Sequence, residues 1–162
     1  MKRILLILLS LTLFLPTMAG QGVSIRKKDS SFSSDILCTV LDGKVYRGSS
    51  TSFDSNILLR IDKNVIYRGN STYQSDILLN IKDKTVYKGR TNYQRDILWT
   101  MRDGALYKGK SSFSSDIIAH LKDSKVYQGT SDFSFAILYT IDGPLTFQEF
   151  IAVWFAVNYL LY

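Results

Sequence analysis

Residues 73–89, YQSDILLNIKDKTVYKG, contain one copy of the pattern that decides the fold. The pattern returns 20 residues later in residues 93–109, YQRDILWTMRDGALYKG. In outline each copy reads aromatic-x-Ser-Asp-Ile-Leu-x-x-Ile, then a turn, then Val-Tyr-basic-Gly. Because self-similarity at a fixed period indicates a repeat architecture, the period outweighs local propensity in predicting the fold. The aromatic residue that opens each copy stands at Phe32, Phe53, Tyr73, Tyr93, Phe113 and Phe133.

Each copy is predicted to form one β-hairpin. Two short β-forming runs flank a pair of turn residues, most clearly Asp42-Gly43 and Asp103-Gly104, and this arrangement is typical of hairpins. Aspartates recur in the serine-rich connections between the hairpins, and we expect them to cap local backbone amides rather than to catalyse a reaction. They are Asp35, Asp76, Asp96 and Asp116, with Asn56 and Ala136 in the two other copies.

The first strand of each copy alternates between apolar and polar positions. In the first copy Ile36, Cys38 and Val40 are predicted to face a core, and the same three columns are apolar in every copy. The column between the last two, which starts at Thr39, is polar or mixed and is predicted to face solvent. The facing of the tyrosines depends on the turn. A three-residue turn would place Tyr46 on the core face, and a two-residue turn would place it on the opposite face.

Half-copies at both ends of the array predict that it closes on itself. Val23–Arg26 matches the second strand of a copy, while Ile137–Ile141 matches a first strand that lacks a second. Together the two halves make one hairpin, whereas an open array would leave unpaired edges and need polar capping units. We therefore predict a mainly β fold, a closed antiparallel barrel of about twelve short strands.

A C-terminal apolar helix is predicted to plug the centre, because about eight strands already enclose a packed interior and twelve leave a wider lumen. Residues 147–162 are apolar almost all round, and Thr146 with Glu149 forms a capping box at their start. A membrane-anchoring tail is the alternative, although 16 residues span only about 24 Å. The predicted plug residues are Phe150, Trp154 and Phe155.

The first 20 residues have the composition of a secretory signal peptide, with Lys2 and Arg3 ahead of an apolar run and small residues after it. The predicted parts are a signal peptide over residues 1–20, the repeat barrel over 21–143 and the helix segment over 144–162, the last two in one domain. We expect an exported protein, periplasmic or extracellular, either free or peripheral to a membrane.

Composition excludes several functions. The chain has 20 Lys and Arg against 14 Asp and Glu, so loss of Lys2 and Arg3 leaves a formal net charge of about +4 and no dense basic face for nucleic acid. One histidine, His120, and one cysteine, Cys38, without a glycine-rich phosphate loop, make no catalytic constellation, so neither an enzyme nor a cofactor is predicted. Residues 142–149 imitate only half of an EF-hand loop, so no metal site is predicted.

The candidate functional position is the residue after each tyrosine, which is basic in most copies. Arg26, after Ile25, is interpreted as its counterpart in the first half-copy. In a closed barrel these cations would form a ring that either protects strand edges or docks on an anionic membrane surface or polysaccharide. Carbohydrate binding beside the tyrosines is the alternative function. The predicted ring is Arg26, Arg47, Arg68, Lys88 and Lys108, interrupted by Gln128.

Tandem Ile-Leu-x-x-Ile, turn, Val-Tyr-x-Gly hairpins followed by a Leu-Thr-x-x-Glu-Phe helix resemble the bacterial β-flower repeat proteins over residues 22–162. The resemblance implies a shallow barrel with hairpin petals. In shape alone, the predicted architecture is similar to the tubby C-terminal domain, a twelve-stranded barrel around a C-terminal helix. No tubby phosphoinositide-binding residue can be matched to a position in this chain, so this second resemblance implies no ligand.

Overall fold

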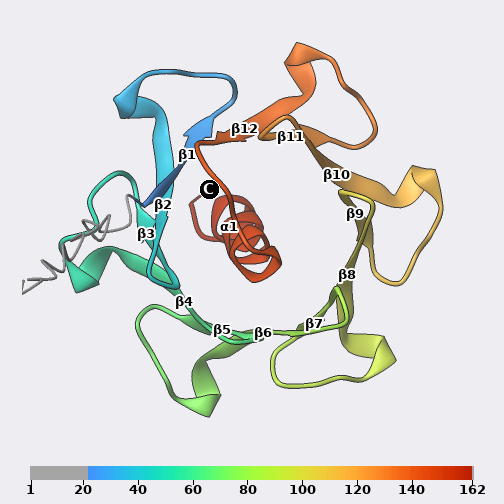
Figure 1. Ribbon diagram of the computed structural model, residues 1–162. Coiled ribbons are helices and arrows are strands. Elements are labelled where there is room, and N and C mark those ends of the chain that lie inside the picture. The colour runs from blue at the N-terminus through green and yellow to red at the C-terminus, as the bar shows by residue number, and fades with distance from the viewer. Residues whose placement is uncertain (1–21, 162) are drawn as a thin grey trace, which may run out of the picture.

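Twelve antiparallel strands form a closed barrel around a central helix (Figure 1), which confirms the predicted fold. The computed structural model describes residues 22–161, and the predicted signal peptide over residues 1–20 lies outside the described residues. The elements are β1 (Val23–Lys27), β2 (Ile36–Leu41), β3 (Lys44–Arg47), β4 (Ile57–Asp62), β5 (Val65–Arg68), β6 (Ile77–Lys82), β7 (Thr85–Lys88), β8 (Ile97–Arg102), β9 (Ala105–Lys108), β10 (Ile117–Lys122), β11 (Lys125–Gln128), β12 (Ile137–Ile141) and α1 (Phe147–Tyr159).

The two ends of the strand array pair with each other, as the half-copies predicted. β1 lies antiparallel to β12 with Ile25 opposite Ile141, and the backbone N–H of Asp142 donates to the carbonyl of Ser24 over 2.9 Å. Arg26 forms an ion pair with Asp142 across this seam. Each strand is therefore hydrogen-bonded on both sides, and the barrel has no free strand edge.

Two-residue turns close the hairpins and decide the facing of the tyrosines. Asp42 and Gly43 both have positive φ, 49° and 69°, as a type I′ turn requires. Tyr46 then lies opposite Thr39 on the outer face, while its neighbour Val45 is buried in the barrel interior. The same register holds in the other complete hairpins, so the alternative with three-residue turns is wrong.

A β-bulge at the start of each even-numbered strand turns the isoleucine column outward. Between β3 and β4, Val45 lies opposite Leu59 but Tyr46 lies opposite Ile57, so Leu58 is the extra residue. Leu59 belongs to the inner core and Leu58 packs against that core, whereas Ile57 shares the outer face with Tyr46. The shift recurs at every junction between hairpins. The prediction that the isoleucines face the barrel core is wrong, because the bulge reverses the alternation.

Six outer loops join the hairpins and project from the barrel like spokes (Figure 1). Each ends in a 3-10 turn that leads into an even-numbered strand, and the outward isoleucine and tyrosine lie on the strands beside it. In the last loop Ala136 joins Tyr127 and Ile137 in a buried cluster separate from the barrel core. The loops are loop 1 (28–35), loop 2 (48–56), loop 3 (69–76), loop 4 (89–96), loop 5 (109–116) and loop 6 (129–136). Their 3-10 turns are Ser33–Asp35, Asp54–Asn56, Gln74–Asp76, Gln94–Asp96, Ser114–Asp116 and Ser134–Ala136.

The polar column of the even-numbered strands holds the loops against the barrel. Thr39 Oγ1 donates to the carbonyl of Gly48, and Thr100 Oγ1 donates to that of Gly109, each over 2.8 Å. Both threonines are buried. The prediction of a solvated column is therefore wrong for these two residues, because the loops fold back over them.

The recurring aspartates have the structural role that was predicted, but through another contact. Asp35 Oδ2 accepts a hydrogen bond from Ser30 Oγ over 2.5 Å, and the same oxygen atom of Ser30 accepts one from the backbone N–H of Phe32 over 3.2 Å. The hydroxyl thus stands between the carboxylate and the amide that the carboxylate was expected to cap. Asp76, Asp96 and Asp116 accept equivalent bonds from Ser71, Thr91 and Ser111.

Helix α1 fills the barrel, so the plug prediction is confirmed. Phe150 and Trp154 are buried in the inner core, as expected. Phe155 is only partly buried, and its ring stacks on that of Tyr159 with 5.1 Å between centroids. The prediction that Phe155 helps to plug the barrel therefore holds only in part, although Ala156 and Val157, which follow it in the helix, are buried. Among residues 22–161 no helix has the length and apolar character needed to cross a membrane.

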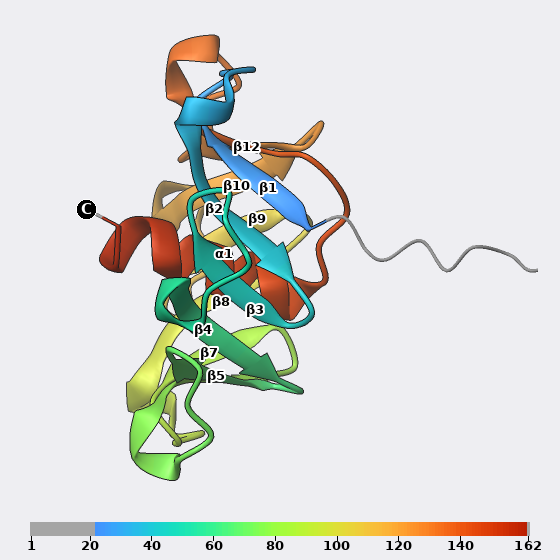
Figure 2. The ribbon, with the colours of Figure 1, turned by 90° about the vertical axis from the view of Figure 1, so that its left-hand side faces the viewer.

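The direction of α1 gives the barrel two different faces, seen edge-on in Figure 2. The predicted capping box is present at the start of the helix, where Thr146 N–H donates to Glu149 Oε2 over 2.8 Å. This end lies among the hairpin turns, since Gln148 Nε2 donates to Oδ1 of the turn residue Asn64 over 2.9 Å. We call this side the turn face. The C-terminal end of α1 emerges on the opposite side, where the outer loops attach, and we call that side the loop face.

Candidate functional site

The structure brings four of the five predicted cations together. Each stands at the end of an odd-numbered strand, where the chain enters an outer loop, and each is exposed. Equivalent strand ends of a closed barrel lie at one level around its axis, so these side chains encircle the C-terminal end of α1 on the loop face. They are Arg47, Arg68, Lys88 and Lys108.

Arg26 does not belong to this ring, and Lys27 takes its place. Arg26 lies opposite Ile36, which is the position that tyrosine occupies in the other hairpins. Its guanidinium bonds to Asp142 and, over 2.8 Å, to the carbonyl of Ser31. Lys27 stands at the end of β1, opposite the inner-core residue Tyr139. Each of the other four cations also lies opposite an inner-core residue. The cation ring is therefore Lys27, Arg47, Arg68, Lys88 and Lys108, with Gln128 in the sixth position.

The cation ring is available for an external partner. In the part of the chain that the structure describes, none of its five members forms an ion pair, whereas Arg26, Lys122 and Lys125 each pair with an aspartate. All strands are paired on both sides, so the folded barrel has no edge for these cations to protect. The nearby C-terminal end of α1 carries a partial negative charge, and the ring also complements that charge.

A second circle of side chains on the outer loops was missed by the sequence analysis as a surface feature. Each aromatic residue that opens a copy directly precedes a 3-10 turn and is exposed, with between 63% and 73% of its surface open to solvent. Their serine-, threonine- and asparagine-rich surroundings were the signal that placed them in loops. Each stands on its own loop, and Phe133 alone of the six stacks on a second exposed ring, that of Phe135. Their repetition at one position of every loop makes them a candidate contact surface. These loop aromatics are Phe32, Phe53, Tyr73, Tyr93, Phe113 and Phe133.

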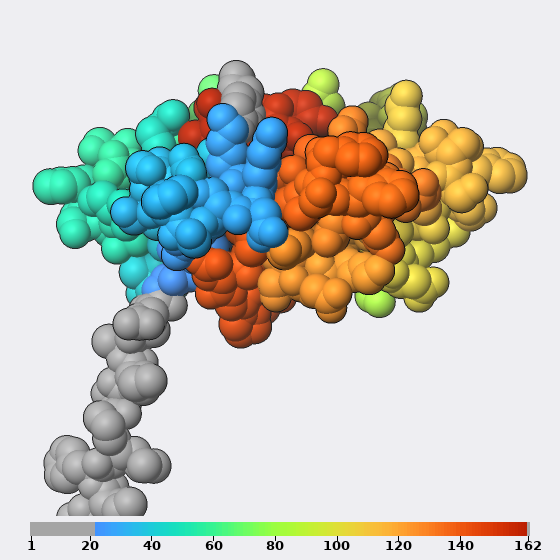
Figure 3. Space-filling model, turned by 90° about the horizontal axis from the view of Figure 1, so that it is seen from above, coloured from blue at the N-terminus to red at the C-terminus, as the bar shows by residue number. Residues whose placement is uncertain are grey.

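Loop 6 departs from the other five. Phe135 replaces the serine or arginine found at this position elsewhere and is 81% exposed, and its ring stacks on Phe133 with 5.5 Å between centroids. Ala136 replaces the carboxylate, and Gln128 replaces the cation. Loop 6 lies beside loop 1 at the seam, where orange and blue atoms adjoin in Figure 3. A cleft of about 280 Å³ here is lined by Lys27, Lys28, Phe135, Ile137, Leu138, Tyr139, Val157 and Asn158.

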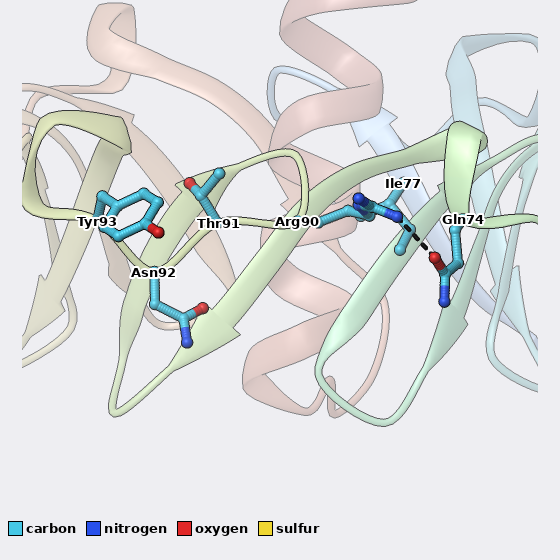
Figure 4. Close-up of a pocket in the computed structure, with 6 residues that line it drawn as sticks. All are labelled: Gln74, Ile77, Arg90, Thr91, Asn92 and Tyr93. Carbon is cyan, nitrogen blue, oxygen red and sulfur yellow. Dashed lines mark hydrogen bonds between the residues drawn. The ribbon is translucent and has the colours of Figure 1, made fainter.

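An open groove of about 660 Å³ separates loops 3 and 4 (Figure 4). The guanidinium of Arg90 crosses toward loop 3 and donates to Gln74 Oε1 over 2.6 Å. Tyr93 lies at the other end of the row of side chains in Figure 4. A few directed polar groups beside an aromatic ring are typical of small-molecule sites, sugar sites included. The full lining is Gln74, Ile77, Arg90, Thr91, Asn92 and Tyr93.

The remaining titratable side chains hold the fold together. His120 belongs to the polar column and lies on the outer face, but only 16% of its side chain is exposed. Its Nε2 bonds to Asp132 and its Nδ1 bonds to the carbonyl of Gly129, each over 2.7 Å. Hydrogen bonds from Lys122 and His120 lower the pKa of Asp132. Burial raises the pKa of the Cys38 thiol to about 12. Within residues 22–161, no three His, Cys, Asp or Glu side chains are grouped closely enough to hold a metal ion.

Comparison with known proteins adds one finding. A family model described as "6-fold beta flower protein" matches residues 25–154, which include most of the barrel and the first half of α1. No curated protein and no solved structure matches the chain. The similarity in shape to the tubby C-terminal domain therefore stays a prediction.

Proposed function

Because the chain belongs to the 6-fold beta flower family, which is not a known enzyme class, we propose that it is an exported, non-catalytic module that docks its loop face on an anionic surface. The observation that carries the proposal is the cation ring, five exposed side chains without ion pairs in the described part of the chain. The signal-peptide composition of residues 1–20 supports export.

The symmetry of the barrel makes the five cations act together. The register between successive hairpins is the same at every junction, for example Val45 opposite Leu59 and Val86 opposite Trp99. The cations therefore stand at one level and meet a flat surface at the same time. An exposed cation near an anionic membrane contributes about 1 kcal/mol, so five bind weakly and reversibly. The attraction decays over a Debye length of about 8 Å at physiological ionic strength, so salt should release the protein.

Co-sedimentation tests the proposal. The mature protein is mixed with anionic and neutral lipid vesicles, and separately with acidic and neutral polysaccharides, at low and high salt. A variant with glutamine at all five ring positions should lose low-salt binding to the anionic partner, and the natural Gln128 shows that the position accepts glutamine. The matched control carries five glutamines on the turn face and should bind like the wild type. Its substitutions are at Lys44, Lys63, Lys82, Lys84 and Arg102. Equal losses in both variants would mean that net charge alone matters and would refute the docking face.

Carbohydrate binding is the second candidate, and the groove between loops 3 and 4 favours it. Arg90, Asn92 and Tyr93 offer charge, amide and ring groups around one open space. Binding to a neutral polysaccharide that survives high salt, and that is lost in Tyr93→Ala but kept in Tyr73→Ala, would support this function instead. Tyr73 is the matched control because it is the equivalent loop aromatic of the neighbouring loop and does not line the groove.

A further inference from the structure

We propose that the docking partner is a lipid bilayer, and that the loop aromatics enter its interface with the Phe133–Phe135 pair as the main anchor. The inference rests on the proposed docking function and assigns a second, apolar component to the same face. The cations then meet lipid phosphates while the phenyl rings lie at the boundary between headgroups and acyl chains.

The arrangement of the loop aromatics fits a flat and extended partner. Six equivalent residues surround the barrel, one on each outer loop, and all six are exposed. A single glycan chain or peptide would meet a few of them, whereas a bilayer surface would meet all six. Tyrosine is enriched at membrane interfaces, and phenylalanine is one of the residues that interfacial segments bury at the boundary between headgroups and acyl chains.

Loop 6 exposes two aromatic rings, whereas each of the other loops exposes one. Phe133 and Phe135 are 69% and 81% exposed and stacked, and the neighbouring carboxylate position is the buried Ala136. Loop 6 also lacks the ring cation, since Gln128 stands there, and its carboxylate, Asp132, already contacts Lys122 and His120. Tyr159, 56% exposed at the end of α1, extends the apolar surface toward the centre of the face.

The cleft beside Phe135 joins the two components. Lys27 and Lys28, both exposed, line it together with Phe135, Leu138 and the buried Val157. A phosphate headgroup at the lysines would place the start of an acyl chain against those apolar side chains. The cleft thus offers cations and apolar side chains side by side, which are the two kinds of group that a lipid would contact.

Charge argues against a second copy of the chain as the occupant. Two loop faces brought together would set one cation ring against another, and like charges in close contact repel. A bilayer offers both anionic groups and an apolar layer on one flat surface.

Fluorescence on the whole mature protein tests insertion directly. Phe135→Trp places an indole on loop 6, and vesicles of anionic and neutral phospholipid are prepared with and without bromine on the acyl chains, because bromine quenches nearby indoles. We expect strong extra quenching in Phe135→Trp compared with the wild type, whose Trp99 and Trp154 are buried. Leu121→Trp is the matched control. Leu121 is exposed but lines the turn-face pocket with Gly104, so its indole should not be quenched.

Binding measurements separate the two components. Phe133→Ser with Phe135→Ser should lower the vesicle partition coefficient at high salt about tenfold to a hundredfold, because two large rings no longer leave water. Ser occupies the Phe135 position in loops 1, 2, 3 and 5, so the fold should tolerate it. Unchanged high-salt binding together with an unquenched Phe135→Trp would overturn the inference. If binding were then still sensitive to salt and dependent on the cation ring, the proposed docking function would remain supported. A five-glutamine variant that binds like the wild type would instead refute the docking function.

Discussion

Truncation of Trp154 should destabilise the barrel more than any other single change in the plug. The side chain is 6% exposed and sits in the inner core, and strands that are bonded on both sides cannot easily collapse into the space it leaves. Large-to-alanine changes of this kind cost about 3–5 kcal/mol, so we expect Trp154→Ala to lose an amount in that range. For a chain of this size the melting temperature should fall by about 6–20 °C.

Trp154→Phe is the informative comparison. The indole Nε1 is buried without a hydrogen-bond partner within residues 22–161. An unsatisfied buried donor costs about 1–3 kcal/mol, so removing it should offset most of the packing lost with the smaller ring. We expect Trp154→Phe to stay within about 1 kcal/mol of the wild type.

Urea unfolding followed by far-ultraviolet circular dichroism measures both changes, since the substitutions alter the tryptophan signal. The midpoint should shift at constant slope, which indicates a change in stability rather than in the surface exposed on unfolding. A Trp154→Ala protein within 1 kcal/mol of the wild type would refute a packed plug. A phenylalanine variant as unstable as the alanine variant would refute the cost assigned to the unpaired indole N–H.

Three further outcomes are expected. Deletion of residues 21–28 removes β1 and exposes the edges of β2 and β12, so size-exclusion chromatography should show that the truncated protein aggregates. A truncated monomer as heat-resistant as the full mature chain would show that closure is not needed. Cys38, whose pKa burial raises to about 12, should react with iodoacetamide only after unfolding, and rapid labelling of the native protein would show that the barrel opens. The pKa of Asp132 is lowered in the folded protein. The ionised carboxylate therefore stabilises the fold at pH values above its usual pKa of about 3.8, and this stabilisation is lost as the pH falls through the lower pKa of the folded state. Protection of the loop 6 amides from hydrogen exchange, measured relative to the intrinsic rate at each pH, should therefore fall in acid for the wild type, and Asp132→Asn should remove that loss of protection.

Closure and plugging could be predicted from the sequence because each leaves a local signature. Val23–Arg26 lacks a first strand and Ile137–Ile141 lacks a second strand. The two half-copies therefore make a complete hairpin only by pairing with each other. The capping box of Thr146 and Glu149 marks the helix start within one residue.

The facing of the isoleucines could not be predicted, because a bulge is invisible when the residues on both sides of it are apolar. Ile57 and Leu58 look alike to an alternation rule, yet one packs outside the barrel and the other inside. Register at these junctions depends on backbone hydrogen bonds rather than on side-chain polarity.

The assignment of Arg26 to the cation ring was wrong for a traceable reason. Its distance of six residues to Phe32 matches that from Arg47 to Phe53, but loop 2 is the one loop with an extra residue. The other loops place the cation five residues before the aromatic, which selects Lys27. The surface formed by the loop aromatics needed the structure, because exposure in a loop depends on how the loop folds back over the barrel.

The seam between β1 and β12 also constrains the order in which the protein can fold. Every other strand pair is joined by a two-residue turn or a short outer loop, so those contacts form locally and at little entropic cost. Arg26 and Asp142 are 116 residues apart, and their contact must wait until nearly the whole chain is present. Local contacts speed folding and distant ones slow it, so the hairpins should form early and the ring should close in a separate, slower step. Helix α1 follows β12 in the chain, so the same late step that joins the ends also fills the lumen. A chain that stops before β12 would have neither, and its two outermost strands would remain open to pairing with another molecule.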